Sequence, residues 1–293
     1  MADEYDMVYY TDLYGIYTND WLNEYPQMNP EQKRGKIGEG SQLIYGGLTK
    51  TELEFLALMK NRNKLIINEF NIIASPTSTA SREAYEDLFD ITWSGWVGRY
   101  FNNLDSSINK ELPKWLLKNY MEQNFNQWPF KKSGIVFVRD EKVVILESEK
   151  HLIKEVPFIH TDNLLAKTYK IDMEIKYPFW FDICYTGNKN EVFSSYRIEA
   201  NAKGDSILKH WNIPDEFPAV IKSKEKYPYY YFAGDFADNP ISMKTAKFKF
   251  ATTFDFLFYQ SEVNERNSFF WKYYNPLIEK ILKDYYIDIK NTK

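Results

Sequence analysis

Crosslinks and flexible residues are scarce in this sequence. Cys184 is its single cysteine, which excludes an intramolecular disulfide, a CxxC redox pair and a thiolate zinc cage. Glycine and proline contribute 12 residues each to the 293, about 8% together against roughly 12% on average, so the chain is not a low-complexity linker. Its composition, 44% hydrophobic and 27% charged, is that of a folded protein. At 293 residues the chain is long enough to bury a core without disulfide bonds.

Charge of one sign and long apolar runs are also lacking. The 37 basic residues stand against 41 acidic ones with no run rich in lysine or arginine, so we expect no nucleic-acid partner. No segment approaches the roughly 18 apolar residues of a membrane helix, and we expect no membrane span in this chain.

The location is not fixed by these features. The N-terminus lacks the regions of a signal peptide, yet a strand-like run begins at once, at 5–11, as in a chain cut at a domain edge. We expect a cell-envelope or extracytoplasmic location if an N-terminal anchor was trimmed, and the cytoplasm otherwise. The oligomeric state is left open.

Aromatic residues are abundant instead. The chain has 8 Trp, 23 Tyr and 21 Phe, or 18% of its residues. One interpretation is a large core and rim built from rings. The other is a groove lined with rings, which suits sugar faces, aromatic groups or apolar ligands.

The first half of the chain alternates helix and strand signals. Thr49 and Glu52 have the spacing of a capping box, which predicts a helix from there to about 61–63. The near-continuous apolar run at 64–70 is typical of a parallel strand buried on both faces. Further helices are predicted at 81–89, after Pro113, and at 268–285 with an interruption at Pro276.

From Gly134 the period changes to two. The runs 135–138 and 143–146 flank Asp140 and Glu141, which predicts a β-hairpin. The segment 93–101 is too rich in glycine for a regular strand and is interpreted as an aromatic loop. We therefore predict one α/β domain over 1–293, with a mostly parallel central sheet, helices on both faces and a β-rich, hairpin-containing insertion at about 130–200.

Several pieces, covering about half of the chain, resemble a known family. They are Gly46–Thr49 before the capped helix, the run 65–71, the segment 75–89, and the later runs 217–220 and 229–236. Their order resembles the class I glutamine amidotransferase-like superfamily, especially its divergent branches without the nucleophile. The resemblance implies a flavodoxin-like sheet flanked by helices.

The departure from that family concerns the nucleophile. Its hydrolase members place a cysteine on a strand-to-helix elbow and pair it with a histidine. The corresponding elbow, near 69–74, contains no cysteine, and Cys184 lies elsewhere and is interpreted as a small buried residue. Classical amidotransferase chemistry is therefore disfavoured.

Acidic or imidazole side chains follow several predicted strands. In open α/β sheets, ligands bind outside the carboxyl ends of the strands, so parallel strands would bring together Asp12, Glu69, His160, Asp182 and Asp235. In the alternative, each side chain caps its own turn or helix. The predicted ligand-binding residues are Asp12, Tyr14, Asn71, Trp96, Arg99, Tyr100 and His160.

Two functions are compatible with this pattern. The first is a binding or accessory protein for a small molecule or glycan, such as cell-envelope material. The second is a glycoside hydrolase in which Glu69 and either Asp182 or Asp235 act as acid and base or nucleophile. No dense metal motif is present, so we expect no metal and no cofactor.

Overall fold

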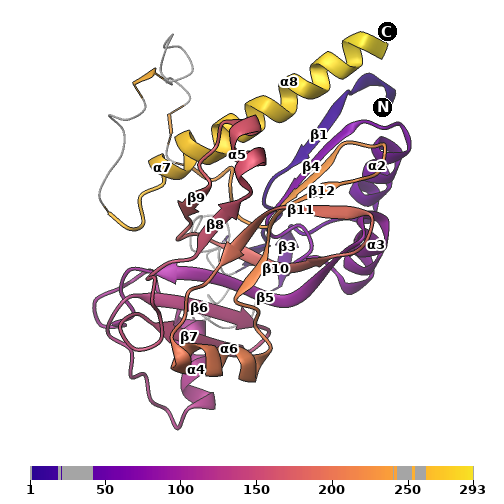
Figure 1. The fold of residues 1–293 in the computed structure, drawn as a ribbon. Helices are drawn as coiled ribbons and strands as arrows, with labels where there is room; N and C mark the ends of the chain where they lie inside the picture. Colours follow the sequence, from indigo (N-terminus) through magenta and orange to yellow (C-terminus); the bar gives the residue numbers. More distant parts are fainter. Residues whose placement is uncertain are drawn as a thin grey trace.

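The larger of two β-sheets combines parallel and antiparallel strands. The computed structural model describes residues 2–18, 21, 42–239, 241–242, 253–254 and 262–292. The sheet has the order β1 (Met7–Tyr10), β4 (Leu65–Glu69), β13 (Tyr229–Phe232), β12 (Glu216–Ser223), β11 (Asn190–Arg197), β8 (Phe158–Thr161) and β9 (Glu174–Lys176) (Figure 1).

Strand direction corrects one prediction. The pairs β1–β4 and β4–β13 are parallel, and all other neighbours in this sheet are antiparallel. The prediction of a mostly parallel sheet was therefore wrong, although the α/β class holds. For β12 and β13 the reason is connection length, because a short turn joins them and leaves no room for a crossover helix.

The parallel part forms as its sequence predicts. Helix α2 (Lys50–Asn61) precedes β4 and starts with the capping box. In this box Glu52 N–H donates to Thr49 Oγ1 at 3.2 Å, and Thr49 N–H donates to Glu52 Oε2 at 2.8 Å. Asn63 takes the left-handed conformation (φ 53°) after the helix. All of β4 is buried, as its apolar run indicates.

A second sheet is entirely antiparallel among the described strands, in the order β10 (Phe181–Thr186), β5 (Ile91–Phe101), β6 (Gly134–Arg139) and β7 (Lys142–Glu147). The predicted hairpin is β6–β7. The segment 93–101, however, is a strand and not a loop. A Cβ on Gly98 would lie 2.2 Å from the Phe181 ring, so glycine allows that ring to lie against the strand.

The expected β-rich insertion is divided between the two sheets. Strands β8, β9 and β11 join the seven-stranded sheet, and β10 joins the four-stranded sheet beside the hairpin. The segment 130–200 therefore does not form one separate β layer.

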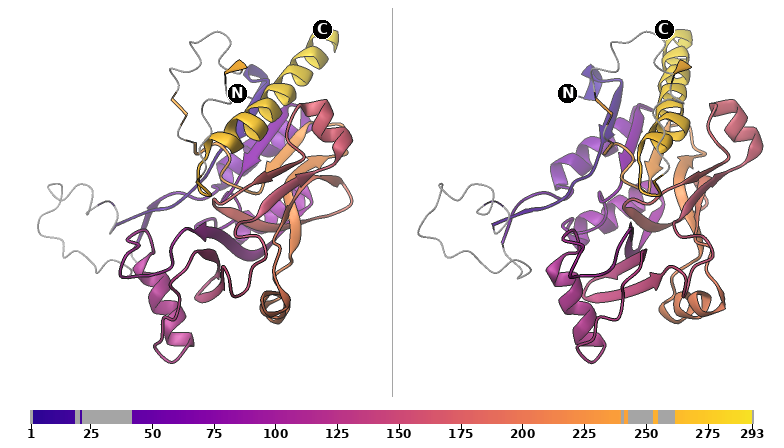
Figure 2. Two further views of the ribbon diagram at one scale, coloured as in Figure 1. Left: turned by 60° about the vertical axis from the view of Figure 1, so that its left-hand side comes forward. Right: turned by 90° about the vertical axis from the view of Figure 1, so that its left-hand side faces the viewer.

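Helices cover both faces of the large sheet (Figure 2). On one face, Phe89 of α3 (Thr79–Phe89) stacks on Tyr229 of β13 at 4.4 Å between ring centroids. On the other, Phe232 of the same strand contacts Tyr274 at 6.5 Å. That second face carries α7 (Asn267–Phe269), a π-helical turn η5 (Phe270–Tyr274) and α8 (Asn275–Thr292). The interruption predicted near Pro276 is thus the π-helical turn that directly precedes α8.

The shorter elements surround these layers. They are η1 (Ala2–Glu4), the paired strands β2 (Ile16–Tyr17) and β3 (Leu43–Tyr45), α4 (Lys114–Gln123), α5 (Asn163–Tyr169) and α6 (Ala202–Trp211). Fully buried rings dominate the core, among them Trp96, Tyr85, Tyr177, Tyr196 and Phe137. Much of the aromatic excess is therefore structural.

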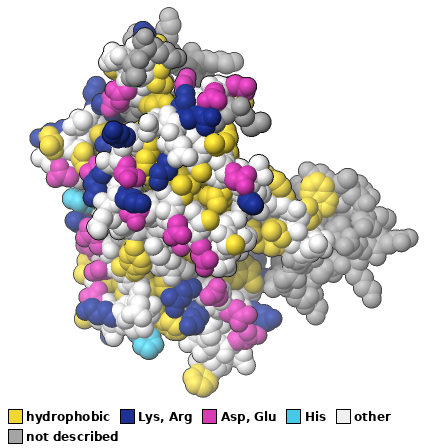
Figure 3. Space-filling view, turned by 90° about the vertical axis from the view of Figure 1, so that its right-hand side faces the viewer, with side chains coloured by type: hydrophobic (Ala, Val, Ile, Leu, Met, Phe, Trp, Pro, Cys, Tyr) yellow, Lys and Arg dark blue, Asp and Glu magenta, His cyan; other side chains and the backbone are white. Residues whose placement is uncertain are grey.

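The surface is mixed in charge. On the face shown in Figure 3, basic and acidic side chains are interspersed. Every helix within the described ranges is too short or too polar to serve as a membrane span.

Candidate functional site

The carboxyl edge of the parallel strands lies where the two sheets meet. Beyond β13, the chain pairs with the start of β10, because Asp182 N–H donates to the Ala233 carbonyl at 2.9 Å and Asp235 N–H donates to the Trp180 carbonyl at 3.1 Å. Asp12 and Asn71 follow β1 and β4 at the same edge. Polar groups that follow separate strands therefore converge at this edge.

One group of these residues forms a hydrogen-bonded chain. Asn71, in the left-handed conformation (φ 67°), donates from its side chain to Asp12 Oδ1 at 3.0 Å and from its backbone to Asp182 Oδ2 at 2.9 Å. Tyr231 donates its hydroxyl to the same Asp182 oxygen at 2.9 Å. Asp182 is fully buried, and burial raises its pKa to about 7 against the effect of both donors.

Glu69 forms a second group with two tyrosines. The Tyr9 hydroxyl donates to Glu69 Oε2 at 2.6 Å and lies 2.9 Å from the Tyr274 hydroxyl, while Ala237 N–H donates to Glu69 Oε1. Burial raises the pKa of Glu69 to about 8, although these hydrogen bonds oppose the shift. Burial therefore favours the protonated form of Glu69 at neutral pH.

The two groups lie on opposite faces of the sheet. Glu69 reaches Tyr274 on the face covered by α8, whereas Asp182 is bound by Tyr231, whose neighbour Tyr229 faces α3. Both carboxyl groups are 0% exposed. Glu69 and Asp182 are thus not placed to flank one glycosidic bond, which requires carboxyl groups on either side of a bound sugar.

Asp235 lies at the border between this buried edge and the surface. Arg266 Nη2 is 3.9 Å from Asp235 Oδ2, and Arg266 Nη1 is 3.0 Å from Asp238 Oδ2. Burial raises the pKa of Asp235 to about 6; the Arg266 charge opposes this rise, and the Asp238 and Asp12 charges add to it. Asp235 also contributes to the raised pKa of Glu69. Its catalytic role, like those of Glu69 and Asp182, stays a prediction.

Two arginines from distant segments meet beside Asp235. The Arg266 guanidinium lies 4.0 Å from the centroid of the Phe179 ring, and that of Arg99, in β5, lies 4.7 Å from Phe101. Arg99 also pairs with Glu111 at 3.1 Å. Burial lowers the pKa of Arg99, and the Arg266 charge acts in the same direction, which shows that the two cations are close.

These arginines line a cavity of about 510 Å³. Its walls consist mainly of charged and amide side chains, with nearly buried rings behind them, and they include Arg99, Asn102, Glu111, Phe179, Asn264 and Arg266. Such a set of donors and acceptors matches the hydroxyl groups of a sugar ring. Among the described residues, this cavity is a place at the edge that a ligand can enter.

The structure brings together some predicted site residues and separates others. Asp12, Glu69, Asn71, Asp182, Asp235 and Arg99 meet at this edge. Tyr100 lines the cavity while its hydroxyl donates to Glu155 at 2.5 Å. Trp96 is fully buried under Arg139, and Tyr14 is 59% exposed outside the cavity.

His160 lies away from the predicted site because of strand direction. It is near the carboxyl end of β8, and three successive antiparallel pairings separate β8 from β13. Strand β8 therefore runs opposite to β13, and its carboxyl end is at the other edge of the sheet. The buried Nδ1 atom of His160 has no hydrogen-bond partner among the described residues.

Sequence reasoning missed the partners that complete this edge. Arg266 lies in a polar stretch without periodicity, and Phe179 precedes a strand. Neither residue belongs to a sequence motif that would predict a binding site. Tyr9 was detectable in principle, because alternate residues of β1 share a face. Within the described part of the chain, no group of three or more His, Cys, Asp or Glu side chains is suited to hold a metal ion.

Comparison with known proteins adds no assignment. No protein-family model, curated protein or solved structure matches this chain. The functional argument therefore rests on the geometry of the carboxyl edge.

Proposed function

We propose that this chain is a non-catalytic carbohydrate-binding protein whose site is the cavity between Arg99 and Arg266. One observation carries the proposal: two guanidinium groups from separate elements lie over aromatic rings and converge on a cavity of about 510 Å³. This volume falls within the ~300–1,000 Å³ of small-molecule sites.

The charge balance favours a neutral sugar over an acidic one. Arg99 is paired with Glu111, and Arg266 is placed between Asp235 and Asp238. These carboxylates neutralise the positive charge of the two arginines, which would otherwise attract an anionic ligand. The same groups offer both donors and acceptors to hydroxyl groups, as a neutral glycan requires.

Binding is favoured over hydrolysis because the carboxyl groups of Glu69 and Asp182 are fully buried. Each accepts a backbone N–H of a nearby loop residue, Ala237 for Glu69 and Asn71 for Asp182. In the proposal these carboxyl groups stabilise the loops at the carboxyl edge and do not contact the ligand.

The kinship with the amidotransferase-like superfamily is kept as a hypothesis within this proposal. The parallel strands β1, β4 and β13 with α2 support it, and the antiparallel strands β8, β11 and β12 depart from it. Glycans of the cell envelope are the ligands we expect first.

A glycan array followed by calorimetric titration tests the proposal. We expect saturable binding that Arg266→Met weakens at least tenfold. Arg82→Met is the matched control, because Arg82 also lies over a ring, that of Trp93 at 5.1 Å, but does not line the cavity. Asn264→Ala, at an exposed position of the cavity wall, provides a second loss-of-binding variant should Arg266→Met fold poorly.

Two results would overturn the proposal. The first is the absence of glycan binding, or equal binding by wild type and both cavity variants. The second is glycan cleavage that Glu69→Gln abolishes while binding is retained, which would establish the hydrolase alternative.

A further inference from the structure

A second cavity, of about 490 Å³, adjoins the Arg99 cavity. Its lining residues follow β5, precede β6 and follow β7, so it lies at one end of the antiparallel four-stranded sheet. Asn102, directly after β5, lines both cavities. The two cavities therefore meet at this residue.

A single tyrosine forms part of the wall between the two cavities. The Tyr100 ring lines the Arg99 cavity, and its hydroxyl donates at 2.5 Å to Glu155 Oε1, which belongs to the lining of the second cavity. Ser133, also in the second cavity, donates its hydroxyl to the same oxygen. Since Asn102 is exposed beside this wall, a ligand in the Arg99 cavity can extend over Asn102 into the second cavity.

The second cavity is balanced in charge, as the first one is. Lys131 pairs with Asp105 at 3.0 Å, and Lys132 pairs with Glu149 at 3.4 Å. A charged ligand would have to displace one member of such a pair. A neutral ligand, in contrast, can form hydrogen bonds to these groups without separating them.

Two amides along this path are free to bind hydroxyl groups. The side chains of Asn102 and Asn264 are exposed and make no hydrogen bond within the described part of the chain. Each of them carries an acceptor and a donor. Ile153 adds an apolar surface to the second cavity, because it is 70% exposed there. The C–H face of a sugar ring would gain free energy by covering it.

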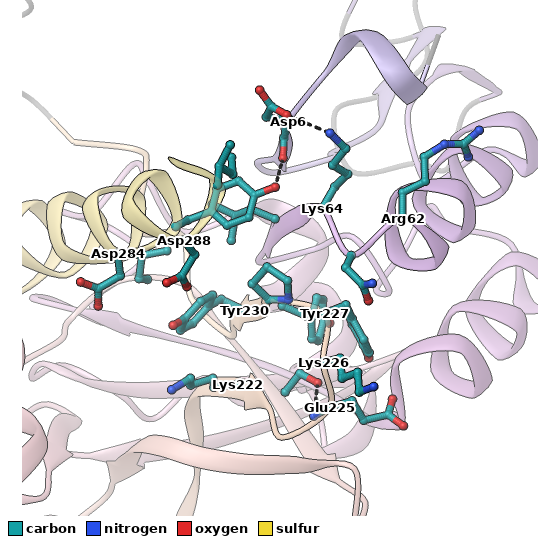
Figure 4. Close-up of a pocket in the computed structure, with 18 of the residues that line it drawn as sticks. Asp6, Arg62, Lys64, Lys222, Glu225, Lys226, Tyr227, Tyr230, Asp284 and Asp288 are labelled. Carbon is teal, nitrogen blue, oxygen red and sulfur yellow. Dashed lines mark hydrogen bonds and ion pairs between the residues drawn. The ribbon is translucent and has the colours of Figure 1, made fainter. Parts of the chain in front are cut away.

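The cavity beneath α8 does not continue this path. It has a volume of about 730 Å³ and shares no lining residue with the other two cavities (Figure 4). Charged groups around it are bound to protein partners, for example Lys64 to Asp6 at 2.8 Å and Lys222 to Glu191 at 3.7 Å. The Arg99 cavity is thus extended only toward Asn102 among these three cavities.

We propose that the Arg99 cavity and the second cavity form one groove that binds a neutral oligosaccharide. One end of the glycan lies in the Arg99 cavity, and the following sugar units cross Asn102 and cover Ile153. The inference rests on the proposed function, because the Arg99 cavity supplies the anchoring site. Each cavity falls within the ~300–1,000 Å³ of small-molecule sites, and the combined groove reaches the upper end of that range.

Calorimetric titration with neutral homo-oligosaccharides of glucose, mannose and N-acetylglucosamine, each from one to six units long, tests this inference. We expect the affinity to rise roughly tenfold or more between the shortest member that binds and the hexamer, because only long members reach Ile153. Ile153→Ala is expected to remove most of this gain and to leave the affinity of the shortest member unchanged. Ile108→Ala is the matched control, since Ile108 is 66% exposed and lies outside both cavities.

A second variant keeps the test open if Ile153→Ala folds poorly. The Asn102 side chain is exposed and makes no hydrogen bond within the described ranges, so Asn102→Ala is expected to keep the fold. It is expected to weaken binding of the hexamer at least as strongly as Ile153→Ala, because the glycan crosses this residue.

The inference fails, while the proposed function stands, if Arg266→Met weakens binding but the affinity does not rise with glycan length. It also fails if Ile153→Ala and Asn102→Ala both leave the affinity of the hexamer unchanged, or if none of these oligosaccharides binds. The proposed function falls with it only if the full glycan array shows no binding, or if binding is insensitive to Arg266→Met and Asn264→Ala.

Discussion

The two edges of the parallel strands use charged residues in different ways. At the carboxyl edge, Glu69 and Asp182 are fully buried and burial raises the pKa of each. At the amino edge, Lys64 and Asp6 form an ion pair whose side chains are 21% and 57% exposed. Burial therefore decides the role: the buried carboxyl groups, with raised pKa values, act as structural hydrogen-bond acceptors, and the exposed pair at the amino edge consists of solvated charges.

The largest expected effect is loss of the buried acceptor. Asp182→Leu removes the partner of Asn71 N–H and of the Tyr231 hydroxyl, both in a buried network. We expect the free energy of unfolding to fall by roughly 3 kcal/mol, measured by urea denaturation. Asp182→Asn keeps an acceptor and is expected to lose less than half of that.

The matched change at the amino edge is Asp284→Leu. Its ion pair with Lys280 is partly exposed on both sides, so we expect a loss below ~1 kcal/mol. Equal losses for Asp182→Leu and Asp284→Leu would contradict the contrast between the edges.

The second effect depends on pH. Folded Glu69, with a pKa of about 8, keeps a proton that the unfolded chain releases near its usual value of 4.5. Its contribution to stability is thus fully present below pH 4.5 and is lost as the pH rises toward 8. We expect Glu69→Gln, which cannot ionise, to be clearly more stable than wild type at pH 8.5, and the difference to shrink to a small fraction of that value at pH 5.

Thermal and urea unfolding across this pH range measures that difference. Glu54→Gln is a suitable control, because Glu54 is 64% exposed in α2. A pH-independent difference between Glu69→Gln and wild type would show that Glu69 is already ionised in the folded protein.

Removal of one hydroxyl is expected to have a smaller effect. Tyr9→Phe deletes the group that links Glu69 to Tyr274, and we expect a loss of about 1–2 kcal/mol. The amino-edge counterpart, Tyr285→Phe, loses a more exposed hydrogen bond to the Asp6 carbonyl and is expected to cost under ~1 kcal/mol. Differential scanning calorimetry of both variants compares them, and a reversed order would contradict the account.

The smallest effect concerns the exposed ion pair of the amino edge. Lys64→Met breaks the pair with Asp6, and we expect a change within ~0.5 kcal/mol that disappears in high salt. A larger, salt-independent loss would show that this pair is structural.

The sequence predicted local units better than their assembly. The capping box of Thr49 and Glu52 and the buried run of β4 set their own structure, and both formed as expected. The direction of β8 depends on long-range pairing that no short pattern encodes, which is why His160 was assigned to the wrong edge. Likewise, Gly98 in β5 is explained by Phe181, a distant neighbour.

The candidate site was predicted in composition but not in geometry. Strand ends identified Asp12, Glu69, Asp182 and Asp235, because polar residues follow buried strands. Whether two of them share a face depends on side-chain alternation and on the partner strand. Arg266 was missed since nothing in its own segment indicates the cavity.

The central claim is that burial favours the protonated form of Glu69 at the carboxyl edge, so that this group supports the binding cavity and does not act as a charge. Carbon-13 NMR titration of the Glu69 side-chain carboxyl, assigned by its absence in Glu69→Gln, tests this claim most directly. We predict a titration midpoint near pH 8. A midpoint near the ordinary glutamate value of 4.5 would contradict the account.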